Sequence, residues 1–274
     1  MTRIALFQST TGIDPTSNAR AMVDAIEQAA AGGAEILFTP EMSGLLDRDS
    51  GRAARVLKAQ DDDEVLAACR EASRRNHIWL HIGSLAVLES GKVANRGFVI
   101  DREGVIRATY DKIHLFDVDL PTGESWRESN VYSPGKGVVL VSGTPVGKLG
   151  LTICYDLRFP GLFARLAESD ADVIAVPAAF TVPTGKAHWH VLLRARAIEA
   201  GLFVVAAAQV GHHEDGRNTF GHSLVVDPWG EILLDMGEEQ GVAFADVDLK
   251  RISDVRSRIP ALNHRRPIPD AVSL

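Results

Sequence analysis

The sequence predicts a single α/β domain in which helices alternate with short buried strands. Short apolar runs are separated by segments whose apolar residues have helical spacing. Residues 171–177 echo residues 34–40: both segments follow an expected helix and end on proline, which suggests two similar halves around one core, although any buried parallel strand that ends at a proline would look the same. With 274 residues and no low-complexity linker, the chain is near the upper limit for one core. We therefore expect one domain over residues 1–274.

The first elements are a strand, a helix and a second strand. Residues 4–8 form a short apolar strand, and Asp14 is placed to cap the helix that follows it. Gly32 is expected to end this helix. The next strand covers residues 34–39 and stops at Pro40, because proline has no N–H to donate to a sheet.

The same signals place the remaining elements. Further helices are expected at residues 61–75, 159–166, 187–201 and 251–259. Further strands are expected at residues 78–83, 84–88, 93–100, 105–110, 146–153, 171–176, 203–209, 223–227, 232–235 and 242–247. The buried stripe of the helix at 187–201 is predicted to consist of His188, Val191, Leu192, Ala195 and Ile198.

Two segments do not fit this alternation. Apolar periodicity fails between residues 111 and 137, and a loop of this length inside a compact domain is usually functional. The tail, about residues 260–274, cannot pack on its own account. We expect it to lie on a partner subunit.

Composition and charge exclude several classes of function. The formal net charge of −7 argues against a surface that binds nucleic acid or an anionic membrane, so small soluble partners are expected. No apolar run is long enough for a signal peptide or a bilayer span. A cytoplasmic location is the resulting prediction.

The two cysteines have different settings. Cys69 lies on the apolar stripe of an expected helix and is predicted to be packing, and a disulfide framework is not indicated. Cys154 ends an apolar strand directly before a helix, where open α/β sheets place their ligands. From its position alone, Cys154 is equally a nucleophile or a buried structural cysteine.

No metal or other cofactor is predicted. His188 and His190 are two residues apart, which points their rings to different faces of a helix. His212 and His213 lie in a loop without a cysteine or aspartate at ligand spacing. These rings are expected to pack or to form hydrogen bonds.

Three polar residues follow expected strands directly: Glu41, Lys112 and Cys154. The carboxyl ends of parallel strands meet at one edge of a sheet, so these side chains are candidates for one site. A thiol with a pKa of about 8.5 is largely protonated near neutral pH and needs a base or a cation beside it. The alternative is that Glu41 and Lys112 are ordinary surface residues.

The segments around these residues resemble the three signature segments of the nitrilase superfamily of carbon–nitrogen hydrolases, in the same order; they are residues 38–42, 110–116 and 150–160. The likeness extends over the whole chain to residues 227–230. It implies a four-layer α-β-β-α sandwich and a Glu-Lys-Cys triad. It also implies a homodimer or larger assembly, often with the carboxyl tail crossing between subunits.

The resemblance assigns a role to each residue of the triad. Cys154 attacks a carbonyl carbon, and Glu41 accepts the thiol proton and later passes a proton to the departing amine. Lys112 and the backbone N–H of Tyr155 hold the oxyanion, and Lys112 helps to keep the thiol ionised. Water then opens the thioester. A second glutamate of the family is placed at Glu128, to orient Lys112 or the amide nitrogen.

Within the superfamily, residues 114–119, 179–185 and 188–199 look most like the branch that contains deaminated-glutathione amidase and ω-amidase. The implied reaction is hydrolysis of the amide of a small carboxylated substrate. Alternatives are an N-carbamoyl hydrolase, an aliphatic nitrilase and a non-catalytic interaction scaffold. The intact triad counts against the scaffold.

Arg158 is the predicted handle for a substrate carboxylate. It lies four residues after the nucleophile, so in a helical turn it would share a face with the thiol, and its planar guanidinium suits a carboxylate. The alternative is that Arg158 pairs with Asp156 or Glu199. Thr184, expected in a loop, and the backbone near Phe180 are predicted to bind the same end of the substrate.

Overall fold

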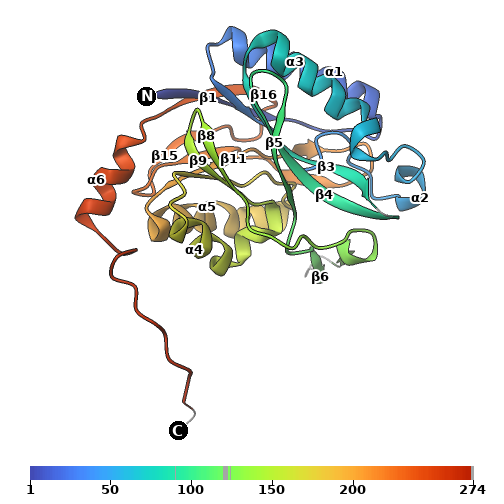
Figure 1. Cartoon of the computed structure of the whole chain (residues 1–274). Coiled ribbons are helices and arrows are strands. Elements are labelled where there is room, and N and C mark those ends of the chain that lie inside the picture. The colour runs from blue at the N-terminus through green and yellow to red at the C-terminus, as the bar shows by residue number, and fades with distance from the viewer. Residues whose placement is uncertain (90, 120–122, 124, 273–274) are drawn as a thin grey trace.

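Two six-stranded sheets form the centre of the molecule (Figure 1). The computed structural model describes residues 1–89, 91–119, 123 and 125–272. The first sheet contains, in spatial order, β16 (Gly241–Val247), β1 (Thr2–Gln8), β2 (Ile36–Phe38), β3 (Trp79–Glu89), β4 (Lys92–Ile100) and β5 (Ile106–Asp111). The second contains β15 (Ile232–Asp235), β14 (Leu224–Val226), β11 (Phe203–Ala206), β10 (Val173–Ala175), β9 (Gly147–Leu151) and β8 (Leu140–Thr144).

Helices cover the outer face of each sheet, which gives the layer order α-β-β-α (Figure 1). On the first sheet lie α1 (Pro15–Ala31) and α3 (Glu64–Asn76), and on the second lie α4 (Pro160–Glu168) and α5 (Val182–Ala200). Shorter pieces are α2 (Ser50–Ala53), α6 (Lys250–Arg258) and the 3-10 turns η1 (Gln60–Asp62), η2 (Glu128–Asn130) and η3 (Cys154–Arg158). The predicted four-layer sandwich is confirmed.

The middle of strand β1 is apolar because both of its faces are buried. Ile4 and Leu6 belong to the core between the two sheets, whereas Ala5 faces the core beneath α1, together with Met22. All four are at most 1% exposed. Each large side chain buried in this way contributes about 1.5–3 kcal/mol relative to exposure.

The predicted start of α1 is correct in detail. The carboxylate of Asp14 accepts hydrogen bonds from the backbone N–H groups of Thr16 (3.3 Å) and Ser17 (3.1 Å), and the helix ends at Gly32. Two other predictions differ from the structure. The strands expected at 78–83 and 84–88 form one strand, β3, with a register irregularity opposite β4, and the expected loop at 111–137 contains a hairpin of β6 (Asp117–Asp119) and β7 (Ser125–Arg127).

The buried stripe predicted for α5 is wrong. This helix begins at Val182 rather than at residue 187, and its buried side chains are Gly185, Trp189, Leu193, Arg196, Ala197 and Ala200. Val191 is 68% exposed and Ile198 is 53% exposed. The core side of α5 carries a charged residue because the Arg196 guanidinium donates to the Leu157 carbonyl oxygen at 2.8 Å, which satisfies the buried charge.

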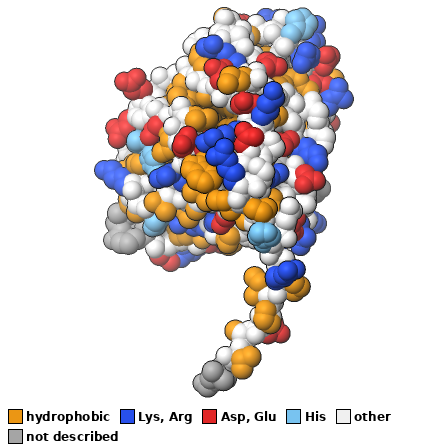
Figure 2. All heavy atoms as spheres, turned by 90° about the vertical axis from the view of Figure 1, so that its left-hand side faces the viewer, with side chains coloured by type: hydrophobic (Ala, Val, Ile, Leu, Met, Phe, Trp, Pro, Cys, Tyr) orange, Lys and Arg blue, Asp and Glu red, His pale blue; other side chains and the backbone are white. Residues whose placement is uncertain are grey.

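The polypeptide after α6 leaves the body of the molecule (Figures 1 and 2). Ile268 is 93% exposed and Val272 is 81% exposed, and Figure 2 shows hydrophobic side chains along this tail. Arg265 touches α4 through Glu168, at 2.8 Å. Among the described residues there is no helix with the length and apolar character needed to cross a membrane. The cytoplasmic location stays a prediction.

Candidate active site

The three residues singled out in the sequence meet between the two sheets. Glu41 follows β2 and Lys112 follows β5, both of the first sheet, whereas Cys154 follows β9 of the second. Their exposed fractions are 5%, 2% and 7%. The Lys112 Nζ donates to Glu41 Oε1 at 2.9 Å, and the Cys154 thiol is near enough to the Glu41 carboxylate for each group to shift the pKa of the other. The alternative of ordinary surface residues is therefore wrong.

Glu128 joins this group from the segment between the Lys112 and Cys154 motifs. Its Oε2 and Oε1 accept from Lys112 Nζ at 2.8 and 3.1 Å, and its Oε2 also accepts from the backbone N–H of Phe116 at 2.7 Å. Lys112 is thus held between two carboxylates. The sequence placed Glu128 correctly beside Lys112.

The backbone at Cys154 has an unusual conformation. Cys154 has φ of 49°, in the left-handed region that costs a non-glycine residue about 1–3 kcal/mol. Its N–H donates to the Pro177 carbonyl oxygen at 2.8 Å, which helps to hold the turn. Cys154 also begins η3, so the N–H of Tyr155 lies in the first turn, where backbone donors have no partner within the helix.

Charges decide the protonation states of the cluster. Burial disfavours an ionised Glu41, but the Lys112 charge and hydrogen bonds from Lys112, the thiol and Asn95 hold the pKa of Glu41 below its usual value. Burial also opposes the Lys112 charge, yet the Glu128 and Glu41 charges raise its pKa well above the usual value. Carboxylate and ammonium are the resting forms.

The thiol behaves differently from the prediction. Burial and the negative charge of Glu41 raise the pKa of Cys154 well above its usual value, and the Lys112 charge offsets only part of this. Lys112 therefore does not keep Cys154 ionised. The resting thiol is protonated and lies against a carboxylate that can accept its proton.

The two segments that echo each other in the sequence meet at this site. The second carboxylate oxygen of Glu41, Oε2, accepts from the backbone N–H of Ala179 at 2.9 Å. Glu41 follows Pro40 after β2, and Ala179 lies two residues after Pro177, beyond β10. Both oxygens of Glu41 are thus fixed, one by Lys112 and one by the opposite half.

Comparison with known proteins decides the family. The family model for carbon–nitrogen hydrolases matches residues 3–257. The chain belongs to the carbon–nitrogen hydrolase family, within the nitrilase superfamily. It is a hydrolase of carbon–nitrogen bonds other than peptide bonds.

Relatives with an assigned activity cover nearly the whole chain. The deaminated glutathione amidase of Yersinia enterocolitica is 37% identical over 98% of this chain and 94% of its own length. The deaminated glutathione amidase of Dictyostelium discoideum is 39% identical over 96% of this chain and 94% of its own length.

Solved structures agree with the fold. The NitFhit protein of C. elegans superimposes with a TM-score of 0.89 at 38% identity; the match covers 97% of this chain and 65% of the NitFhit chain. A mutant of the amidase from Nesterenkonia sp. AN1 has a TM-score of 0.79 at 28% identity and covers 95% of this chain and 98% of its own. That structure shows acrylamide added to the active-site cysteine of the amidase.

Asn95 is a further residue of the site in this carbon–nitrogen hydrolase, and it was not predicted from the sequence. Asn95 lies on β4, is fully buried, and its Nδ2 donates to Glu41 Oε1 and to Glu128 Oε1, each at 3.0 Å. The backbone carbonyl oxygen of Asn95 also accepts from the backbone N–H of Lys112 at 3.0 Å. The Asn95 side chain therefore binds the carboxylates of both Glu41 and Glu128 and sets the distance between them. A buried asparagine in a strand otherwise rich in apolar residues was the available signal.

Asp156 is the second residue that was missed. This fully buried carboxylate accepts from Tyr110 Oη at 2.7 Å and from the backbone N–H of Ile153 at 2.9 Å. Its other oxygen accepts from the backbone N–H of His114 at 3.1 Å and lies 2.7 Å from His114 Nδ1. Asp156 thereby joins the turn of the nucleophile to the segment that carries Lys112.

The structure contradicts the expected helical turn at Arg158 and the ion pairs of its alternative, while its role as a carboxylate handle stays a prediction. The turn after Cys154 is a 3-10 turn, so residues four apart do not share a face. The guanidinium lies over the Phe180 ring at 5.4 Å from its centroid and 3.3 Å from His188 Nδ1. Asp156 makes the contacts given above, and the partner of Glu199 is Arg196, at 2.8 Å. Arg158 is therefore not held by either carboxylate of the alternative.

The other residues expected to bind the substrate, Thr184, Phe180 and Tyr155, contact neighbouring side chains of the protein. Thr184 lies in the first turn of α5 and not in a loop, and its hydroxyl is 2.8 Å from the Thr181 hydroxyl. Phe180 is 5% exposed and packs on Trp189, with ring centroids 4.8 Å apart. The Tyr155 ring meets Phe116 edge to face, with centroids 5.1 Å apart.

Proposed function

We propose that this carbon–nitrogen hydrolase is a cysteine-dependent amidase that releases amine or ammonia from a small carboxylated amide. The observation that carries the proposal is the buried cluster in which Glu41 accepts from the ammonium of Lys112 and lies near the thiol of Cys154. Deaminated glutathione, or an ω-amide of a 2-oxo dicarboxylic acid, is the proposed substrate type. Two relatives are deaminated glutathione amidases.

The first chemical step joins sulfur to the amide carbon. Glu41 takes the thiol proton as the Cys154 sulfur attacks, and the carbonyl π electrons move onto oxygen. Lys112 and the backbone N–H of Tyr155 stabilise this oxyanion. Donors aimed at developing charge in a dry site are usually the largest single contribution to rate.

The second half of the cycle restores the enzyme. As the tetrahedral intermediate collapses, the carbon–nitrogen bond breaks and the amine leaves with the proton held by Glu41, which forms a thioester on Cys154. Glu41 then takes a proton from water, and the resulting hydroxide attacks the thioester. The acid product leaves when the carbon–sulfur bond breaks and the sulfur recovers a proton.

Glu128 acts through Lys112 in this scheme. Two carboxylates around one ammonium hold Lys112 charged, and the bond from the Phe116 N–H fixes the direction of Glu128. Lys112 therefore meets the oxyanion as a full positive charge. Glu128 is a positioning residue.

The first experiment measures ammonia or amine release from four kinds of compound: deaminated glutathione, ω-amides of 2-oxo acids, N-carbamoyl amino acids and aliphatic nitriles. We expect turnover of the carboxylated amides, abolished by Cys154→Ala and retained by Cys69→Ala, which is the matched control. If carbamoyl compounds or nitriles were preferred, the protein would be an N-carbamoyl hydrolase or an aliphatic nitrilase, and the proposed amidase activity would be wrong. Inactivity on every compound would favour an interaction scaffold.

The second experiment concerns the carboxylate. Arg158 has no carboxylate partner among the described residues, and the rings of Phe180 and His188 keep its guanidinium in place. Arg158→Met should raise KM for a carboxylated amide about 10- to 100-fold, which corresponds to the loss of a hydrogen bond to a charged group. The KM for the methyl ester of the same amide should remain nearly unchanged. Equal losses on both compounds would make Arg158 structural.

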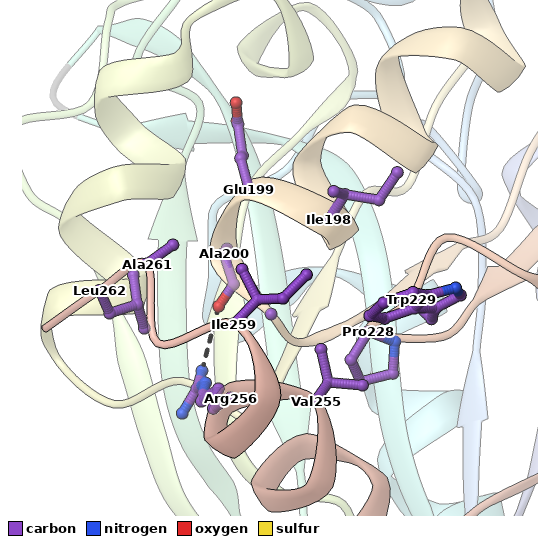
Figure 3. Close-up of a pocket in the computed structure, with 11 residues that line it drawn as sticks. Ile198, Glu199, Ala200, Pro228, Trp229, Val255, Arg256, Ile259, Ala261 and Leu262 are labelled. Atoms are coloured by element: carbon purple, nitrogen blue, oxygen red, sulfur yellow. Dashed lines mark hydrogen bonds between the residues drawn. The ribbon is translucent and has the colours of Figure 1, made fainter. Parts of the chain in front are cut away.

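The proposed assembly is a homodimer or larger. Val191 and Ile198 are seven residues apart and thus lie on the same face of α5, where both are exposed. Ile198 also borders an apolar groove with Trp229 and Ile259, at the start of the tail (Figure 3). A chain truncated after Ile259 is expected to associate more weakly in light scattering than the full chain. If the truncated chain has the same molar mass as the full chain on dilution, the tail has no role in the assembly.

A further inference from the structure

A cluster of two histidines and one aspartate lies outside the proposed active site. His190 comes from α5, His222 from the turn before β14 and Asp235 from the end of β15. His190 Nε2 is 3.0 Å from Asp235 Oδ2, and His222 Nδ1 is 2.9 Å from Asp235 Oδ1. The sequence around His190 offers only His188 as a nearby imidazole. Its partners are more than 30 residues away.

The ligand atoms have the identity and the spacing of a divalent transition-metal site. One atom from each residue lies within 4.8 Å of the others. In a tetrahedral zinc site with ligands at about 2.0–2.1 Å, neighbouring ligand atoms are about 3.3 Å apart. A single oxygen, Asp235 Oδ2, lies 3.0 Å from His190 Nε2 and 3.2 Å from His222 Nδ1, close to this separation.

Neighbouring groups hold these side chains in place. The backbone N–H of Gly237 donates to Asp235 Oδ1 at 2.9 Å, which fixes the carboxylate. The His222 ring stacks on Phe220 with centroids 4.4 Å apart, and the carbonyl oxygen of His222 accepts from Trp189 Nε1 at 2.8 Å. A ligand set that is oriented by its surroundings loses little conformational entropy when it binds an ion.

Access and charge also suit a cation. The side chains of His190, His222 and Asp235 are 32%, 23% and 32% exposed, so an ion can reach them from solvent. Asp235 adds a carboxylate oxygen to the two imidazole nitrogens. Two imidazoles and one carboxylate leave a fourth position for water.

We propose that His190, His222 and Asp235 bind one zinc ion, or another divalent ion of similar preference, and so cross-link α5 to the second sheet. Imidazole nitrogen and carboxylate oxygen together suit zinc and cobalt better than magnesium or calcium, which prefer oxygen ligands alone. None of the residues of the proposed catalytic cluster takes part. The proposal therefore stands or falls independently of the amidase activity.

The test uses the full chain without a histidine tag, stripped of metal by a chelator. Zinc is titrated by calorimetry and cobalt by visible absorption, because tetrahedral cobalt absorbs strongly. We expect one ion per chain and a higher Tm with zinc. His190→Ala and Asp235→Asn should each weaken binding at least tenfold. His222→Asn should do the same, and asparagine tolerates the backbone at this position, where φ is 55°.

The matched controls are His188→Ala and His212→Ala. His188 lies on the same helix beside Arg158, and His212 lies in an exposed hairpin, so neither should change the affinity. The proposal is overturned if the stripped chain binds neither ion. It is also overturned if the three ligand variants bind zinc as tightly as the unchanged chain, or if the control variants lose as much affinity as the ligand variants.

Discussion

Replacing Asn95 by alanine tests whether the spacing of two carboxylates controls the chemistry. The change removes the Nδ2 group that lies 3.0 Å from both Glu41 Oε1 and Glu128 Oε1. Burial opposes the charge of Glu41, and Asn95 is one of the donors, after Lys112 and the thiol, that keep its pKa low. Without Asn95 the pKa of Glu41 should rise.

The size of the change follows from the number of bonds. Asn95 makes one hydrogen bond to the Glu41 carboxylate, and a bond to a charged group is worth about 1.5–3 kcal/mol. Since about 1.4 kcal/mol is a factor of ten, losing this bond should disfavour the ionised form of Glu41 about 10- to 100-fold. Glu41 must be ionised to accept the thiol proton. The acid limb of kcat/KM should therefore move to higher pH.

The assay is ammonia release from the best amide substrate at pH values where circular dichroism shows a folded chain. Asn18→Ala is the matched control, because Asn18 is also a buried asparagine but its Nδ2 donates to the carbonyl oxygens of Gly12 and Gly44. It should lower stability and leave the acid limb in place. If Asn95→Ala leaves the acid limb unmoved, or if Asn18→Ala moves it equally, the assigned role of Asn95 is wrong.

Two further predictions concern Lys112 and His81. Lys112→Met should lower kcat at least ~100-fold, as loss of an oxyanion donor does, and kcat within a few-fold of the unchanged enzyme would remove Lys112 from the mechanism. His81 is buried, and burial lowers its pKa from 6.5 to about 3, so below pH 6.5 the unfolded chain binds a proton that the folded chain does not. Stability is therefore complete above pH 6.5 and falls with pH down to about 3. At pH 5 the loss is about 2 kcal/mol, measured by urea unfolding. His81→Leu should remove this slope, and an unchanged slope would assign it to other groups.

The sequence predicts well those features that depend on neighbours along the chain. Asp14 caps α1 through the next two N–H groups, and the strand ends that present Glu41, Lys112 and Cys154 are marked by local apolar runs. The position of Glu128 came from resemblance to a family. Its contact with Lys112 joins residues 16 apart, which no local pattern encodes.

Features that depend on distant partners were missed for the same physical reason. Arg196 is buried because the Leu157 carbonyl oxygen, 39 residues away, accepts its guanidinium, and so the core side of α5 is not the most apolar one. Asn95 acts on a glutamate 54 residues away, and His190 meets an aspartate 45 residues away. Polar groups of this kind are predictable only when the fold has shown which strands are adjacent.

Because the active centre is divided between two sheets, turnover requires both sheets to be folded and packed against each other. Glu41 and Lys112 follow strands of one sheet and Cys154 follows a strand of the other, so either half can retain its strands without forming a competent centre. The core packed between the sheets, together with contacts such as the pairing of Ser9 with Gln209, fixes the relative position of the two halves. A partly unfolded chain that keeps its secondary structure but loosens the contact between the two halves would have no activity. Its circular dichroism signal would remain. Inactivation at urea concentrations below the main unfolding transition would mark such an intermediate.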